Sequence, residues 1–121
     1  MRISSICLLI VALAMPVSLN AAPAKGLGMW VWSDSSFSTD EARQNLIRFC
    51  VKRQISHLDI HIHMSGDKEN PIVRDAEALR DLILLAGVHH ITIAALRGNP
   101  KMFFSENHEQ TLQELRAIVA F

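Results

Sequence analysis

Hydrophobic positions along this chain follow two alternating spacings. Short apolar runs rich in strand-forming residues cover residues 28–32, 55–64 and 91–96. After each run, apolar residues recur every three or four positions, the spacing of one buried helix face. Strands that alternate with helices predict an α/β fold, in which helical crossovers join parallel strands in a right-handed sense.

Local signals indicate where the helices begin and end. Ser38 followed by Glu41 forms a capping-box pattern before the first helix, and Asn107 is suited to cap the third. Gly87 stands where a glycine often ends a helix. Residues 65–71 contain Gly, Asp, Asn and Pro, so we expect a loop between the second strand and its helix.

The first residues have the three-part pattern of a secretory signal peptide. Arg2 is followed by an uncharged apolar run over residues 6–19, and small residues occupy most of 20–24. The run is shorter than the ~20 residues that a membrane-spanning helix needs. We therefore predict a signal peptide at residues 1–22 and a secreted or periplasmic protein with no stable membrane span after cleavage.

Cleavage after Ala22 would leave a mature domain over residues 23–121, and cleavage after Ala21 would leave one residue more. Either cleavage would remove Cys7 and leave Cys50 alone, so the mature chain could form no internal disulfide. The whole chain has 12 basic and 12 acidic residues, and this balance argues against nucleic-acid binding.

The second predicted strand carries a row of polar side chains. Because side chains alternate faces along a strand, His57, Asp59, His61 and His63 share one face, opposite an apolar face that suits packing against helices. Buried polar groups need partners. We therefore expect water, a ligand or further side chains to meet the histidine face.

In parallel α/β folds, ligand sites gather at the carboxyl ends of the strands. Trp32, near the end of the first strand, suits stacking on a sugar, whereas Trp30 is better explained by packing. Arg97 follows the third strand and could bind an acidic or hydroxyl-rich ligand or remain solvated in a loop. The predicted substrate-binding residues are Trp32, Asp59, His61, His63 and Arg97.

Four short segments of the sequence resemble the N-terminal part of a family of secreted bacterial glycoside-hydrolase-like proteins. They are residues 28–32 (Gly-Met-Trp-Val-Trp), 49–50, 95–100 and 107–108. The resemblance implies a (β/α)8 barrel of which this chain forms the N-terminal part, with about three strand–helix units. It also implies carbohydrate binding or hydrolysis in the full-length lineage, with no cofactor. The acidic motif expected after the fourth strand would lie beyond this chain, so the catalytic residues stay unknown and we expect the chain alone to be inactive.

Two other interpretations remain open. His61 and His63 could begin the metal site of an amidohydrolase-like, metal-dependent hydrolase, because His-x-His places two imidazoles on one strand face. In amidohydrolase barrels this motif belongs to the first barrel strand, whereas in this sequence a strand–helix unit precedes it. We therefore expect no metal. Alternatively, the chain is a truncated product without function. A partial barrel also leaves one sheet face open, which predicts self-association through that face.

Overall fold

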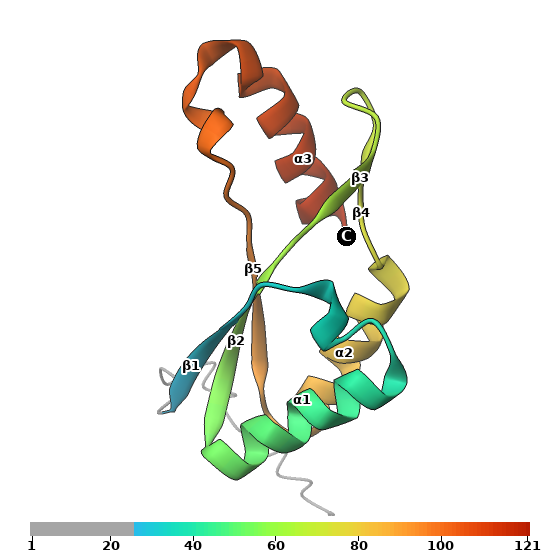
Figure 1. Ribbon diagram of the computed structural model, residues 1–121, viewed down its shortest axis with the longest axis vertical. Coiled ribbons are helices and arrows are strands. Elements are labelled where there is room, and N and C mark those ends of the chain that lie inside the picture. Colours follow the sequence, from blue (N-terminus) through green and yellow to red (C-terminus); the bar gives the residue numbers. More distant parts are fainter. Residues whose placement is uncertain (1–25) are drawn as a thin grey trace, which may run out of the picture.

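The computed structural model describes residues 26–121, which form a mixed α/β fold (Figure 1). The predicted signal peptide at residues 1–22 lies outside the described residues. The strands are β1 (Leu27–Val31), β2 (Ile55–His61), β3 (Met64–Gly66), β4 (Pro71–Val73) and β5 (Thr92–Leu96). The α-helices are α1 (Asp40–Arg53), α2 (Ala76–Val88) and α3 (His108–Ala120). Short 3-10 helices span Asp34–Ser36 (η1), Pro100–Phe103 (η2) and Ser105–Asn107 (η3).

The main sheet contains three parallel strands in the order β1-β2-β5. Trp30 of β1 is paired with Asp59 of β2, which is paired in turn with Ala94 of β5. Helix α1 connects β1 to β2, and α2 lies in the longer connection from β2 to β5. The prediction of a parallel α/β sheet is therefore confirmed, and in residues 26–121 the sheet is open rather than closed into a barrel.

One face of the sheet packs against α1 and α2, which lie on the same side in Figure 1. Leu58 and Ile60 of β2 are completely buried there, together with Cys50 of α1 and Leu82 of α2. Burying a side chain of this size contributes roughly 1.5–3 kcal/mol to folding. This layer forms the hydrophobic core. Because side chains alternate along a strand, the remaining side chains of β1 and β2 point away from the helices.

The other face of the sheet is uncovered by any described helix. It carries Trp30 on β1, with Trp32 just beyond the strand, and both indole side chains are more than half exposed, at 63% and 56%. Beside them on β2 lie His57, Asp59 and His61, all partly exposed. Large aromatic side chains are usually buried, so this exposed pair makes the open face unusual.

The loop that we expected at residues 65–71 is shorter in the structure, because strands on both sides of residues 67–70 pair as a β-hairpin. Strands β3 and β4 pair antiparallel, with Met64 opposite Val73, and Gly66 has a positive φ of 84°. An added Cβ at Gly66 would come within 2.5 Å of the carbonyl oxygen of Asn70, so the glycine permits this close approach. Helix α3 packs against β4, beyond the end of the sheet, instead of covering the sheet like α1 and α2.

The predicted helix ends are partly wrong. The side chain of Thr39, not Ser38, caps α1 by accepting a hydrogen bond from the backbone N–H of Ala42. Helix α2 continues through Gly87, and the left-handed residue after it is His90, with φ 58°. Asn107 does precede α3, but its side-chain amide donates to the carbonyl oxygen of Lys101. None of the helices in residues 26–121 is long and apolar enough to cross a membrane.

Candidate functional site

Four rings form a continuous row from the open sheet face to the carboxyl edge of the sheet. Trp30 and Trp32 meet edge to face, with ring centroids 5.8 Å apart and an interplanar angle of 84°. The ring centroids of Trp32 and His61 are 5.2 Å apart, and those of His61 and His63 are 4.6 Å apart. Because β1 and β2 are adjacent and parallel, their carboxyl ends bring these side chains together.

A buried carboxylate lies at the end of the row. Asp34 begins the 3-10 helix η1 that follows β1, where the Ser33 side chain accepts a hydrogen bond from the backbone N–H of Ser35. Oδ1 of Asp34 lies 2.8 Å from Nδ1 of His63, and Oδ2 accepts a 2.6 Å hydrogen bond from Nε of Arg74. The Asp34 side chain is only 11% exposed, so the two partners offset much of the cost of its burial.

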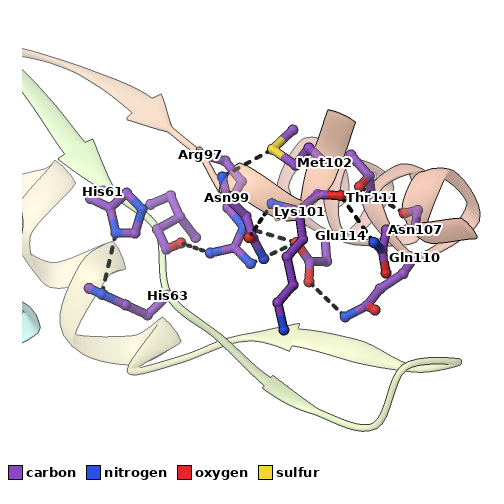
Figure 2. Close-up of polar contacts among 11 residues, drawn as sticks. His61, His63, Arg97, Asn99, Lys101, Met102, Asn107, Gln110, Thr111 and Glu114 are labelled. Carbon is purple, nitrogen blue, oxygen red and sulfur yellow. Dashed lines mark hydrogen bonds and ion pairs between the residues drawn. The ribbon is translucent and has the colours of Figure 1, made fainter. Parts of the chain in front are cut away.

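The two histidines next to each other on the strand face are also joined. Nδ1 of His61 and Nε2 of His63 are 3.3 Å apart, within hydrogen-bonding distance, as Figure 2 shows. Asp34, His63 and His61 therefore form a hydrogen-bonded chain, which we call the histidine relay, and its far end contacts Trp32.

His57 and Asp59 form a separate cluster nearer the amino end of β2. Nε2 of His57 is 3.2 Å from Oδ1 of Asp59, and its Nδ1 is 2.7 Å from the hydroxyl of Thr92 on β5. The Thr92 hydroxyl donates in turn to the carbonyl oxygen of Ser56. This cluster links β2 to β5 and is not hydrogen-bonded to the histidine relay within the described residues.

Arg97 belongs to a different environment from the other predicted site residues. Its Nε and Nη2 both donate to Oε2 of Glu114 on α3, at 2.9 and 2.7 Å, and its Nη1 donates to the carbonyl oxygen of Ile62 (Figure 2). The two side chains are 14% and 10% exposed. Arg97 therefore ties α3 to the ends of β2 and β5.

A polar cleft of about 220 Å³ lies beside this ion pair, between the β3–β4 hairpin and the segment that leads into α3. Figure 2 shows several of its side chains, which include both hydrogen-bond donors and acceptors. The lining residues are Lys68, Asn99, Lys101, Met102, Asn107, Gln110, Thr111 and Glu114. Oε1 of Glu114 accepts from Gln110, so both carboxylate oxygens already have protein partners.

The structure thus brings together three of the five predicted site residues, Trp32, His61 and His63, and places Asp59 and Arg97 in other clusters. Sequence reasoning missed Asp34 and Arg74. Asp34 could have been found, because it directly follows the first strand, at the edge where ligand sites gather. Arg74 follows the unpredicted hairpin, and no signal in the sequence connects it to Asp34.

The histidines do not present the arrangement of a preformed metal site. Both ring nitrogens of His63 are within hydrogen-bonding distance of protein partners, and Nδ1 of His61 is occupied by His63. In the part of the chain that the structure describes, no three His, Cys, Asp or Glu side chains are grouped as metal ligands.

Comparison of the chain with protein-family models, curated proteins and solved structures found no match, so its function has to be inferred from the site itself.

Proposed function

We propose that the open sheet face binds carbohydrate at its carboxyl edge, with Trp32 as the stacking platform. The observation that carries this proposal is the exposure of two tryptophans, at 63% and 56%, on an ordered strand and its immediate extension. An indole ring combines a large apolar face with an N–H donor, which suits the apolar face and polar edge of a sugar ring.

The neighbouring groups support a polar, uncharged ligand. A sugar hydroxyl can both donate and accept hydrogen bonds. The imidazole of His61, 5.2 Å from Trp32 between ring centroids, can meet such a hydroxyl, and Asp59 offers an acceptor further along the strand. No cationic side chain belongs to the ring row itself, so an anionic ligand would gain little there.

We assign binding rather than hydrolysis to this face. Glycoside hydrolysis ordinarily needs two carboxyl groups placed on either side of the scissile bond. The carboxylates nearest the row are Asp34, held by His63 and Arg74, and Asp59, in contact with His57. Both carboxylates already have protein partners, and we propose that the chain alone does not cleave glycosides.

We further propose that the described units belong to a (β/α) barrel lineage and that the protein is exported. Parallel sheets are normally covered on both faces, and in a barrel the polar face of β2 would point inward. The carboxyl edge that carries Trp32 would then lie where barrel enzymes have their active sites.

Tryptophan fluorescence can test the binding proposal directly. The chain contains two tryptophans, and both belong to the proposed site. We would titrate the full chain with soluble pentasaccharides of glucose, xylose, mannose and N-acetylglucosamine. We expect saturable fluorescence changes with at least one of them.

Trp32→Ala should weaken binding about tenfold. An aromatic contact contributes up to about 1.4 kcal/mol in addition to the free energy of burying its apolar surface, and 1.4 kcal/mol corresponds to a factor of ten in affinity. Phe103→Ala is the matched control, because Phe103 is an exposed aromatic residue on η2 that lies outside the sheet face. Equal affinities for wild type and Trp32→Ala, or no response to any sugar, would refute the proposal.

A further inference from the structure

The two oxygens of Asp34 determine the direction of the hydrogen bonds around it. Arginine has donors only, so Oδ2 of Asp34 accepts from Nε of Arg74. A carboxylate paired with a guanidinium is an acceptor at both oxygens. The 2.8 Å contact of Oδ1 with Nδ1 of His63 therefore requires that the histidine carry its proton on Nδ1.

This proton position determines the next one. A neutral imidazole has one N–H and one lone pair, so Nε2 of a neutral His63 is an acceptor. Nδ1 of His61, 3.3 Å away, must then be the donor. As a consequence, the lone pair of His61 is on Nε2, which has no hydrogen-bond partner among residues 26–121.

We propose that Asp34 and His63 are positioning residues that hold His61 as a proton acceptor, with its Nε2 lone pair available beside the ring of Trp32. The structure provides the three features that such a group needs: a buried carboxylate, an intervening imidazole and a terminal nitrogen next to an exposed aromatic platform. A carboxylate that fixes a histidine tautomer is the arrangement by which hydrolases orient a general base.

The ligand of this acceptor is a hydroxyl group. A hydroxyl of a molecule stacked on Trp32 would donate to Nε2 of His61, without formation or cleavage of a covalent bond. Only the identity of that donor rests on the proposed carbohydrate function. The tautomers of His61 and His63 follow from the contacts of Asp34 alone and can be tested without a ligand.

Nitrogen-15 NMR of the histidine-labelled full chain tests the tautomers at pH about 8, where imidazole is ordinarily neutral. The chain has six histidines, so each ring can be resolved and assigned. A nitrogen with a proton and a nitrogen with a lone pair resonate in well-separated regions. We expect His61 and His63 both to carry the proton on Nδ1. A proton on Nε2 of His61 would overturn the proposal.

Asp34→Asn provides a second, directional test. The introduced amide must present its oxygen to Arg74, because Arg74 can only donate, and it then presents its NH2 group to Nδ1 of His63. Nε2 of His63 would become the protonated nitrogen, and Nδ1 of His61 the acceptor. We therefore expect both tautomers to reverse, which a purely structural role of Asp34 does not predict. Unchanged tautomers in a folded Asp34→Asn variant would also overturn the proposal.

Asp59→Asn is the matched control, since Asp59 contacts His57 and not the relay. It should leave the tautomers of His61 and His63 unchanged, and a reversal there would contradict the assignment to Asp34. If Asp34→Asn does not fold, the wild-type spectrum alone still decides between the two tautomers of His61.

A ligand titration separates this inference from the proposed function. A pentasaccharide that binds should shift the Nε2 resonance of His61 in the wild type as that nitrogen accepts a hydrogen bond, whereas in the Asp34→Asn variant the same nitrogen carries a proton and should donate to the hydroxyl oxygen instead. Trp32→Ala should lose affinity while both tautomers stay as in the wild type. Absence of sugar binding with the expected tautomers would refute the carbohydrate proposal and support the relay. Sugar binding that leaves Nε2 of His61 unshifted would refute the role of His61 as the acceptor.

Discussion

Oδ1 of Asp34 and Nδ1 of His63 lie 2.8 Å apart although 29 positions separate the two residues in the sequence. Asp34 follows β1 and His63 follows β2. The contact exists because the two strands are parallel neighbours, so the segments that leave their carboxyl ends meet at one edge.

Arg74 brings a third segment to the same place. It follows β4, and its backbone N–H donates to the carbonyl oxygen of His63 while its Nε binds Asp34. The β3–β4 hairpin therefore delivers the cation that keeps Asp34 an acceptor.

The ion pair of Arg97 and Glu114 should be important for stability. Both side chains are mostly buried, and removal of one partner leaves the other charge buried without compensation. We expect Arg97→Met to lower the free energy of unfolding by about 3 kcal/mol. Urea denaturation monitored by circular dichroism provides the measurement.

A double-mutant cycle separates the pair from the packing around it. Arg97→Met together with Glu114→Leu should be clearly less destabilising than the sum of the single changes, because the double variant buries no unpaired charge. Additive effects would show that the two side chains do not depend on each other. Arg116→Met is the matched control, since among residues 26–121 the only ion pair of Arg116 is a long, exposed contact with Glu109, and the change should alter stability by less than about 1 kcal/mol.

Two leucines on α2 provide a matched test of the core. Leu82 is completely buried against the sheet, whereas Leu84, two positions on, is 71% exposed. Leu82→Ala should lower the free energy of unfolding by about 3 kcal/mol, through lost burial and the cavity that remains. Leu84→Ala should change it by less than about 0.5 kcal/mol. Similar losses at both positions would mean that α2 packs differently from the arrangement described above.

The sequence predicted the elements whose signals are local and repeated. The apolar positions Leu58 and Ile60 alternate with polar ones along β2, and this alternation correctly separated the buried face from the open one. The three- and four-residue spacing of apolar positions likewise predicted that the helix after the first strand has one buried face, where Ile47 and Cys50 of α1 lie. The exposed histidine face also followed from alternation alone.

The features that were missed depend on contacts between distant segments. Pro71 is a typical loop residue, yet it begins β4, which pairs with β3 and packs against α3. Arg97 was expected either to bind a ligand or to stay solvated in a loop, and only the position of α3 in space shows that Glu114 binds it. Propensities describe a residue and its neighbours in sequence, so they contain no information about such partners.

Cys50 should make stability depend on pH in the alkaline range. Burial raises the pKa of its thiol, because the thiolate would lose its hydration in the core. In the folded protein the thiol therefore keeps its proton at a pH where the unfolded chain has begun to lose it. The contribution to stability is complete below the pKa of the unfolded thiol and decreases as the pH rises above it.

Denaturant titrations at pH about 7 and about 9.5 would measure this effect, which amounts to at most about 1.4 kcal/mol per pH unit. Cys50→Ala is the control, because it retains every other titrating group. The free energy of unfolding should fall less steeply with pH in Cys50→Ala than in the wild type. Identical slopes would contradict the burial of the thiol, as would rapid labelling of Cys50 by a thiol reagent under native conditions.

The open sheet face should make the protein self-associate. Trp30 and Trp32 are exposed there, and within the described residues β1 and β5 each have one unpaired edge. Contact between two such faces would bury apolar area worth roughly 2 kcal/mol per indole. Sedimentation equilibrium of the full chain should therefore show an average mass that rises with concentration.

Trp30→Ser should weaken this association roughly 1,000-fold, because each of the two contacting faces loses one indole worth roughly 2 kcal/mol. Phe103→Ser is the matched control, because Phe103 is 88% exposed but lies on η2, outside the sheet face. A pentasaccharide that binds at Trp32 should compete with the second copy and lower the average mass. A monomer at all concentrations would contradict the prediction, and equal effects of the two substitutions would place the contact elsewhere on the molecule.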